Sequence, residues 1–324
     1  MRAFQVTEFG ASPLLVDAET PATSQNDVMV KIEACGLNFA DLLMIKGEYQ
    51  DTPKPPFTLG MEVAGTVQEV GEGVNHLPLG SRIAVFGGSG GLADYGVFPA
   101  DRCVILPDNM PFTDAAAFMV AYGTSHMALG YKAGLQAGET LLVLGAAGGV
   151  GLTAVEIGKL MGARVIACAR GAEKLAVAKA AGAAHVIAAT TEDIREVCNS
   201  LGGDDVVYDP VGGDQFTAAF RACKPEARIL TIGFASGTVP QVPANHLLVK
   251  NISLIGFYWG GYLKFKPDAL TNSLTELFDL YAQGRINPHI SDVFPLERAA
   301  DGLELLRSRK STGKVVIEMK QPSA

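Results

Sequence analysis

One stretch of the chain, Leu141 to Gly151, combines an apolar run with a cluster of glycines and reads Leu-Leu-Val-Leu-Gly-Ala-Ala-Gly-Gly-Val-Gly. Leu141–Leu144 is a continuous apolar run, as expected for a parallel strand buried on both faces. A glycine-rich turn follows, and Leu152–Met161 has the apolar spacing of a helix. Backbone N–H groups at the start of such a helix bind phosphate. Gly148 and Gly151 would let a pyrophosphate approach the backbone and let the helix pack close to the strand. We therefore predict cofactor contacts at Ala147, Gly148, Gly149 and Val150.

The glycine pattern departs from Gly-x-Gly-x-x-Gly, because Ala146 takes the first position, before Gly148 and Gly151. The alternative interpretation is a turn that is merely rich in small residues. The next expected strand, Arg164–Ala167, favours the nucleotide site. Where an NAD site has an acid for the ribose 2′-hydroxyl, this chain has Arg170 and, one helical turn on, Lys174. We therefore predict NADPH rather than NADH, against the alternative that both are solvated surface charges.

Length and composition narrow the class of protein. The chain has 324 residues, which favours two domains, and its net charge of −8 argues against nucleic acid or an anionic membrane as the main partner. No apolar run reaches transmembrane length. The five cysteines show neither metal-ligand spacing nor a disulfide framework, so we expect reduced thiols in a cytoplasmic protein.

The first part of the chain predicts short strands that form an antiparallel, barrel-like domain. Thr113 is a plausible N-cap for a helix over Asp114–Phe118, and Tyr122–Ser125 is expected to interrupt the helix, which resumes over Ser125–Tyr131. The expected strands are Val28–Ala34, Gly60–Val70, Arg82–Phe86, Tyr95–Phe98 and Cys103–Leu106.

From Leu141 onward strands and helices alternate, which predicts a doubly wound parallel sheet of six strands. The expected strands are Leu141–Leu144, Arg164–Ala167, His185–Ile187, Val206–Tyr208, Arg228–Ile232 and Ser253–Phe257. The expected helices are Leu152–Met161, Ala172–Ala181, Thr191–Leu201, Gln215–Ala222 and a segment near Asn245–Lys250.

The tail has helical patterns at Pro267–Gln283 and Leu296–Arg307 and a last strand at Lys314–Glu318. We expect it to rejoin the first domain. The predicted organisation is a catalytic domain over residues 1–121, rejoined by 265–324, and a nucleotide-binding domain over 122–264.

Seven segments in this order resemble one family, the zinc-independent (zeta-crystallin-like) quinone oxidoreductases of the medium-chain dehydrogenase/reductase superfamily. The resemblance covers almost the whole chain, and it implies a GroES-like β-barrel-type domain plus a Rossmann domain. The segments are Gly36-Leu37-Asn38-Phe39-Ala40-Asp41, Gly60-Met61-Glu62-Val63-Ala64-Gly65, Tyr122-Gly123-Thr124, Ala146-Ala147-Gly148-Gly149-Val150-Gly151, Asp209-Pro210-Val211-Gly212-Gly213, Gly233-Phe234-Ala235-Ser236-Gly237 and Thr312-Gly313-Lys314-Val315-Val316.

The superfamily's alcohol dehydrogenases hold a catalytic zinc with Cys, His and Cys, which would fall at Asn38, Met61 and near Ala121 in this chain. Asn and Met do not replace thiolate and imidazole at a zinc site. We therefore expect no metal. Without a metal, the substrate is expected to be a quinone or an α,β-unsaturated carbonyl, which accepts hydride with little Lewis-acid help.

Asn38 and Tyr49 are the candidate catalytic residues, because in the family the Asn and Tyr at these positions lie near the nicotinamide and the substrate. Leu43 stands where some relatives carry a second tyrosine. The alternatives are an asparagine that stabilises a turn and an aromatic residue of a surface loop.

The resemblance implies further cofactor-binding residues: Asn38, Asp41, Thr124, Gly233, Phe234, Ala235, Phe257, Trp259 and Lys314. Asp41 could instead anchor the Asn38 loop, the aromatic pair could serve packing, and Lys314 could cap a strand end.

These observations predict an NADPH-dependent, metal-free quinone reductase. The alternatives are an alkenal or enoyl-thioester reductase, and a non-enzymatic NADPH-binding crystallin-like or RNA-binding protein. The family also implies a homodimer or homotetramer formed through the edge strand Ser253–Phe257.

Overall fold

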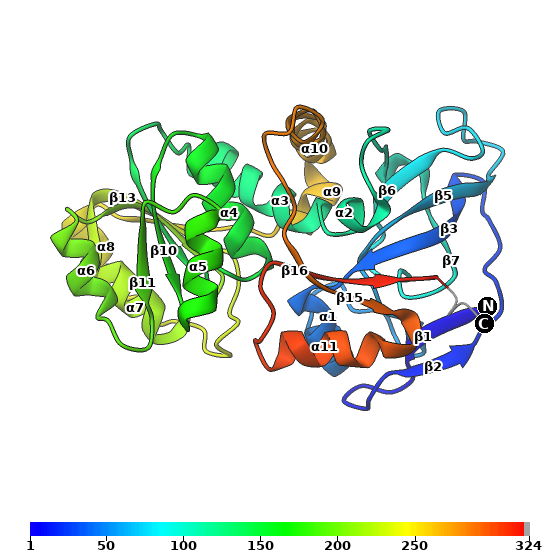
Figure 1. Cartoon of the computed structure of the whole chain (residues 1–324), viewed down its shortest axis with the longest axis horizontal. Coiled ribbons are helices and arrows are strands. Elements are labelled where there is room, and N and C mark those ends of the chain that lie inside the picture. Colours follow the sequence, from blue (N-terminus) through cyan, green and yellow to red (C-terminus); the bar gives the residue numbers. More distant parts are fainter. Residues whose placement is uncertain (321–324) are drawn as a thin grey trace. The chain divides into compact units, whose positions relative to one another are not determined.

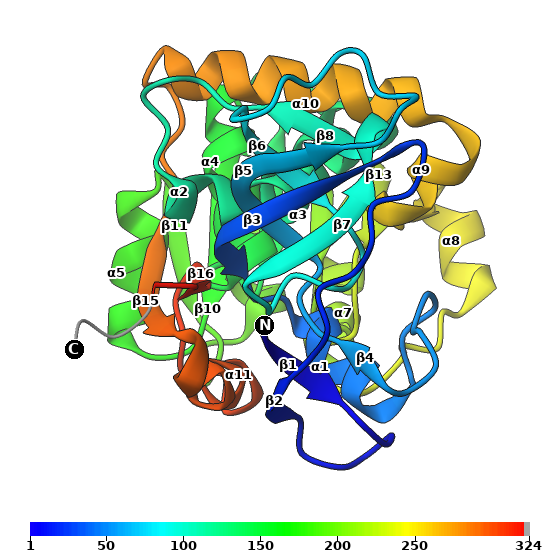
Figure 2. The ribbon, with the colours of Figure 1, turned by 90° about the vertical axis from the view of Figure 1, so that its right-hand side faces the viewer.

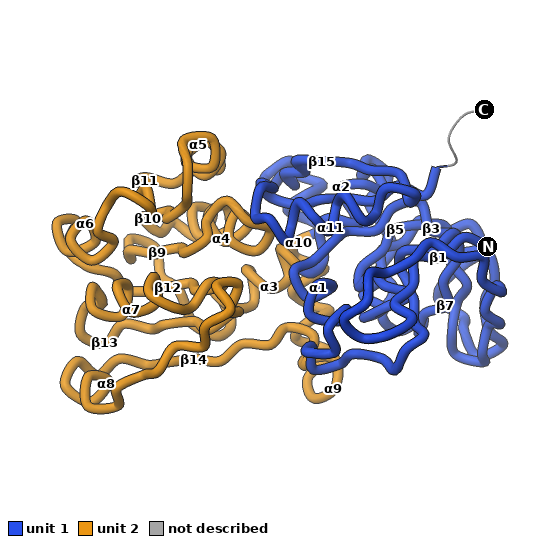
Figure 3. The backbone as a smooth tube through the Cα atoms, turned by 90° about the horizontal axis from the view of Figure 1, so that it is seen from below, with its two compact units in different colours: residues 1–120, 278–324 blue, residues 121–277 orange. Residues whose placement is uncertain are grey.

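The structure is a computed structural model that describes residues 1–320. It divides into two compact units, coloured separately in Figure 3. Unit 1 comprises residues 1–120 and 278–324, and unit 2 comprises residues 121–277. The chain therefore leaves unit 1 within helix α3 (Met119–His126) and returns to it within helix α10 (Pro267–Ala282).

Unit 2 contains a parallel sheet of six strands, which lies in the green part of the ribbon in Figure 1. The strand order is β11-β10-β9-β12-β13-β14, and Figure 3 labels all of these strands. The strands are β9 (Thr140–Leu144), β10 (Arg164–Ala169), β11 (His185–Ala188), β12 (Asp204–Asp209), β13 (Cys223–Thr231) and β14 (Ser253–Gly256). All five side chains of β9 are buried, as expected for a central strand covered on both faces. The strand order reverses between β9 and β12, which is where such sheets bind ligands.

Helices cover both faces of this sheet. Helices α4 and α5 pack on β9, β10 and β11, whereas α7 packs on β9, β12 and β13. The helices that follow β9 in unit 2 are α4 (Gly149–Leu160), α5 (Ala172–Ala180), α6 (Ile194–Ser200), α7 (Gly213–Ala222), α8 (Ala244–Lys250), α9 (Tyr262–Phe265) and the first part of α10.

Unit 1 contains a seven-stranded sheet and a three-stranded sheet, with helices α1 (Phe39–Lys46), α2 (Phe112–Ala116) and α11 (Ala299–Arg307) (Figure 2). The large sheet has the order β15-β16-β3-β5-β6-β8, and β7 pairs with β3. Its strands are β3 (Asp27–Gly36), β5 (Glu62–Val70), β6 (Arg82–Phe86), β7 (Tyr95–Pro99), β8 (Cys103–Ile105), β15 (Ile290–Pro295) and β16 (Lys314–Glu318). The small sheet contains β1 (Arg2–Val6), β2 (Leu14–Asp17) and β4 (Phe57–Thr58).

The register of the large sheet determines which residues meet at the end of β3. Gly36 pairs with Glu62 of β5 on one side and with Val316 of β16 on the other. The last residue of β3 therefore lies between the start of β5 and the middle of the C-terminal strand β16, although these segments are far apart in sequence.

Two details of the predicted helices are wrong. Helix α2 begins at Phe112 after the N-cap Pro111, so Thr113 lies inside the helix. Helix α3 runs through Tyr122–Ser125 without a break and continues as a π-helical segment over Met127–Lys132. Gly123 serves packing rather than helix termination, because a Cβ there would lie 2.6 Å from the indole nitrogen of Trp259.

Candidate functional site

The turn between β9 and α4 has the geometry of a phosphate-binding turn. Gly151 cannot carry a side chain, because its Cβ would lie 2.2 Å from the carbonyl oxygen of Gly145. This contact holds the first turn of α4 against the end of β9. The first N–H groups of a helix lack intrahelical acceptors, so those around Gly149 and Val150 are available to an anion. Ala147 is buried, whereas Gly148 is exposed at the turn.

Two cations lie at the carboxyl end of the neighbouring strand. Arg170 directly follows β10 and is exposed, and Lys174 is half-buried in the first turns of α5. Burial lowers the pKa of Lys174, and the charge of Arg170 lowers it further. The carboxylate of Glu173 partly offsets the effect of Arg170 on Lys174. A bound anion would favour the charged forms of both cations.

The loops after β12 and β13 lie against each other. The backbone N–H of Gly233 donates to the carbonyl of Asp209, and that of Ala235 donates to Pro210. The Asp209 carboxylate accepts the N–H groups of Val211 and Gly212, and burial raises its pKa. Phe234 is 38% exposed at this edge of the sheet.

Three buried hydroxyls connect helices α3 and α4 with strand β12. Ser125 Oγ lies 2.7 Å from Thr153 Oγ1 and 3.2 Å from the Tyr208 hydroxyl. Thr153 donates to the carbonyl of Ala121 at 3.0 Å, and burial raises the pKa of Tyr208. Sequence reasoning assigned these hydroxyls no role, because each lies in an ordinary helix or strand pattern.

The other predicted cofactor residues of unit 2 lie in its interior. Thr124 is buried on α3 beside Ser125. Trp259 packs on Gly123, and Phe257 packs against Tyr262 with ring centroids 5.5 Å apart. Packing within unit 2 thus accounts for the burial of both aromatic residues, and their contact with a cofactor stays a prediction.

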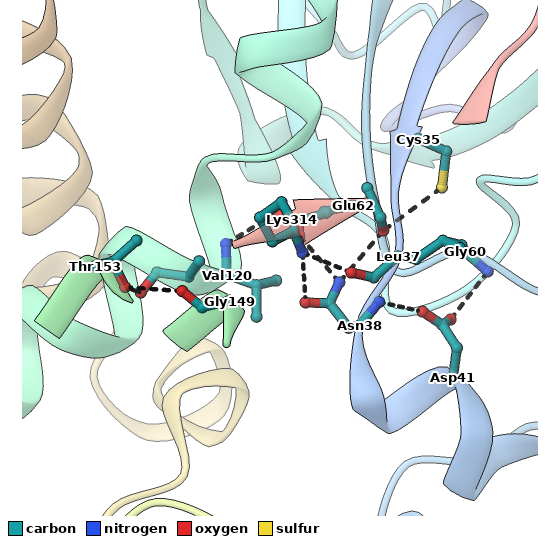
Figure 4. Close-up of polar contacts among 12 residues, drawn as sticks. Cys35, Leu37, Asn38, Asp41, Gly60, Glu62, Val120, Gly149, Thr153 and Lys314 are labelled. Carbon is teal, nitrogen blue, oxygen red and sulfur yellow. Dashed lines mark hydrogen bonds and ion pairs between the residues drawn. The ribbon is translucent and has the colours of Figure 1, made fainter. Parts of the chain in front are cut away.

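The polar centre of unit 1 consists of three buried side chains, Asn38, Glu62 and Lys314 (Figure 4). Lys314 Nζ donates to Glu62 Oε1 at 2.7 Å, to Asn38 Oδ1 at 2.8 Å and to the carbonyl of Leu37 at 2.8 Å. Asn38 Nδ2 donates to Glu62 Oε1 at 2.9 Å. Glu62 Oε2 accepts the N–H of Val120 at 2.9 Å, near the start of α3.

Asp41 anchors the loop that carries Asn38. Its carboxylate accepts the backbone N–H of Asn38 at 2.8 Å and that of Gly60 at 3.3 Å. The side chain is fully buried, and desolvation raises its pKa to about 6. Contact of this carboxylate with a cofactor stays a prediction.

Helix α1 separates Tyr49 from Asn38 along the chain. Asn38 directly precedes α1, whereas Tyr49 follows its C-cap, Gly47, in a half-buried bend. An eight-residue helix spans roughly 12 Å, so the two predicted catalytic residues stand beyond opposite ends of α1.

The residues at the expected zinc positions do not fit a metal. Met61 is a buried thioether, and the Asn38 amide is engaged by Lys314 and Glu62. Within residues 1–320, no group of three or more His, Cys, Asp or Glu side chains could hold a metal ion. The cysteines of the chain are free thiols.

No helix within residues 1–320 is long and apolar enough to cross a membrane.

Glu62 was not predicted as a site residue, although a carboxylate directly before the apolar run Val63–Gly65 is a signal of a buried polar contact. Lys314 was predicted without its partner, since 252 residues separate the two.

Two known domain families match this chain, one in its N-terminal part and one in its C-terminal part. Residues 24–108 match the alcohol dehydrogenase GroES-like domain, and residues 149–278 match the zinc-binding dehydrogenase domain. A quinone oxidoreductase-like protein 2 homolog from Nematostella vectensis is 40% identical over 99% of this chain and 89% of its own length. The human synaptic vesicle membrane protein VAT-1 homolog is 34% identical over 93% of this chain and 81% of its own.

Among solved structures, the Escherichia coli quinone oxidoreductase complexed with NADPH aligns with a TM-score of 0.91 and 29% identity. The alignment covers 98% of this chain and 100% of that one. The chain has the α/β fold of a medium-chain dehydrogenase/reductase, with a GroES-like domain and a Rossmann sheet, which confirms the predicted fold class. It belongs to the quinone oxidoreductase family of that superfamily.

Proposed function

We propose that this chain is an NADPH-dependent, metal-free reductase that transfers reducing equivalents to quinones. The observation that carries the proposal is the combination of a phosphate-binding turn at Gly145–Gly151 with two adjacent cations, Arg170 and Lys174. A pyrophosphate suits the turn, and a 2′-phosphate suits the cations. Membership in the quinone oxidoreductase family and the NADPH in the E. coli neighbour support the same cofactor.

The residues of unit 2 would bind and orient the cofactor. The N–H groups at Ala147, Gly149 and Val150 would hold the pyrophosphate. Gly148, whose own N–H donates to the carbonyl of Gly145, would let the pyrophosphate approach the backbone. Arg170 and Lys174 would hold the 2′-phosphate. Thr124 and the loop Gly233-Phe234-Ala235 are further proposed contacts. Bound NADPH would supply a hydride, which reduces a quinone to a hydroquinone together with one proton.

The residues of unit 1 would assist the acceptor. Negative charge develops on a carbonyl oxygen during reduction, and a preorganised hydrogen-bond donor stabilises it. We propose Asn38 as that donor and Tyr49 as the source of the proton, with water as the alternative source.

The test is NADPH consumption in the presence of a metal chelator. The acceptors are 1,4-benzoquinone, 9,10-phenanthrenequinone, an alkenal and crotonyl-CoA, with NADH in parallel. We expect turnover of the quinones with NADPH and little turnover with NADH. Turnover of the alkenal or the thioester alone would instead establish a double-bond reductase, and activity lost on chelation would overturn the metal-free assignment.

We further propose a cytoplasmic homodimer or homotetramer that assembles through β14. This strand ends the six-stranded order and leaves one edge to pair. Leu248 and Val249 on the preceding helix are each 78% exposed, and Leu254 is 39% exposed. Light scattering after size exclusion is expected to give a multiple of the 34.0 kDa chain mass. The substitution Leu254→Glu is expected to shift the protein toward monomer, and a monomeric wild-type protein would overturn this proposal.

A further inference from the structure

Lys314 and Glu62 form an ion pair in the interior of unit 1. The Nζ–Oε1 distance is 2.7 Å, and the side chains are 5% and 0% exposed. Taking two charges out of water is costly, so a buried pair is weak evidence for a gain in stability. The role of the pair is therefore sought in its hydrogen bonds to the neighbouring side chain of Asn38.

The pair fixes the orientation of the Asn38 amide (Figure 4). The ammonium has three N–H donors, and all three have acceptors within unit 1. An amide oxygen only accepts and an amide NH2 only donates. A flipped Asn38 would place its NH2 group against the ammonium and its oxygen against the carboxylate. Lys314 and Glu62 thus select one of the two amide orientations.

The same contacts polarise the amide. An ammonium bound to Asn38 Oδ1 draws electron density from the amide and makes its N–H groups stronger donors. One Nδ2 hydrogen goes to Glu62 Oε1 at 2.9 Å, and the other goes to the carbonyl of Gly36 at 3.3 Å. The second is the longest hydrogen bond made by these three side chains, so it is the hydrogen that a substrate oxygen can take over.

We propose that Lys314 and Glu62 are positioning residues, which orient and polarise Asn38 so that its Nδ2–H stabilises negative charge on the acceptor oxygen. This inference rests on the proposed reductase function. It replaces the predicted contact of Lys314 with the cofactor, because the ammonium is already saturated. Asn38 occupies the position at which a zinc ligand of the superfamily's alcohol dehydrogenases would fall. In this chain the positive charge of Lys314 acts there through the Asn38 amide.

The test compares Lys314→Met with the double variant Lys314→Met/Glu62→Gln, which removes both charges and leaves no unpaired carboxylate. Lys320→Met is the matched control, since Lys320 is 74% exposed and pairs with Glu318 on the surface. Each protein is assayed with NADPH and two acceptors, 1,4-benzoquinone and a methylated benzoquinone of lower reduction potential. NADPH affinity is measured by fluorescence titration.

We expect both Lys314 variants to lose about a hundredfold in kcat/KM with the weaker acceptor and about tenfold with 1,4-benzoquinone, because the less reactive acceptor depends more on charge stabilisation. NADPH affinity is expected to stay within about twofold of wild type. Lys314→Arg, which keeps the charge, is expected to recover part of the loss.

Equal losses with both acceptors would indicate a general structural role and overturn the inference. Weakened NADPH binding would do the same, by making Lys314 a cofactor ligand. A wild-type protein that reduces neither quinone would overturn the proposed function and this inference with it. Active wild type with Lys314→Met indistinguishable from Lys320→Met would overturn this inference alone.

Discussion

The two units build their polar sites from different groups. In unit 2, the candidate site is a single strand, turn and helix, in which the first N–H groups of α4 lack intrahelical acceptors and a glycine permits close packing. In unit 1, the site is three side chains from β16, β5 and the residue before α1, brought together by strand pairing. The first kind of site depends on backbone geometry, whereas the second depends on charge and orientation. Each therefore has its own sensitivity to substitution and pH.

Substitution of Gly151 gives the largest expected effect. Gly151→Val places a side chain 2.2 Å from the Gly145 carbonyl, so the turn and α4 must separate. We expect a loss of more than about 3 kcal/mol, as for overpacking with no space to relax, and no measurable NADPH binding in a fluorescence titration. Gly148→Ala is the graded comparison, since its Cβ would meet the same oxygen at 3.4 Å. Similar binding by both variants would show that backbone approach does not define this site.

The second largest expected effect is a pH-dependent contribution of Asp41 to the free energy of unfolding. Desolvation raises the pKa of Asp41 from 3.8 to about 6 in the folded protein, so the folded state holds a proton that the unfolded state releases. Stability from this group is therefore highest below about pH 4 and falls as the pH rises through about 6, by about 3 kcal/mol.

Urea unfolding of wild type and Asp41→Asn at pH 4, 5, 6 and 7 measures this contribution. The difference between their free energies of unfolding is expected to change over that range, while the amide has no proton to lose. A difference that is constant with pH would contradict the raised pKa.

Loss of the cations of unit 2 is expected to change cofactor choice. Arg170→Ala and Lys174→Ala each remove one charged hydrogen-bond donor, which is worth about 1.5–3 kcal/mol, or roughly tenfold to a hundredfold in NADPH affinity. Affinity for NADH should stay the same. Lys179→Ala on the same helix is the control, since Lys179 donates to the carbonyl of Ala184. Parallel losses for both nucleotides would show that the cations do not contact the 2′-phosphate.

Substitution of Tyr208 gives the smallest expected effect. Tyr208→Phe removes the buried hydroxyl that lies 3.2 Å from Ser125 Oγ, at a cost of about 1 kcal/mol in the free energy of unfolding. Tyr131→Phe is the control, because the Tyr131 hydroxyl accepts a hydrogen bond from Lys266 at the surface. Identical unfolding midpoints would show that the hydroxyl chain adds nothing to the support of α4.

The difference between the two units also explains which parts of the fold and of the candidate site could be predicted from the sequence. The strands of unit 2 were predictable because β9 and its neighbours carry continuous apolar runs followed by glycine turns. In unit 1, the elements β1, β2, β4, β15 and α1 were not anticipated, because short strands and an eight-residue helix give weak periodic signals. Lys314 and Glu62 stand 252 positions apart, so their contact follows only from the register of β3 with β5 and β16.

The division between the two units is tested most directly by two substitutions measured side by side. NADPH affinity and kcat/KM for 1,4-benzoquinone at saturating NADPH are determined for Arg170→Ala and Lys314→Met. We expect Arg170→Ala to weaken NADPH binding with little change in kcat/KM, and Lys314→Met to lower kcat/KM with little change in binding. If both variants lose affinity and kcat/KM in the same proportion, cofactor binding and acceptor activation are not divided between the two units.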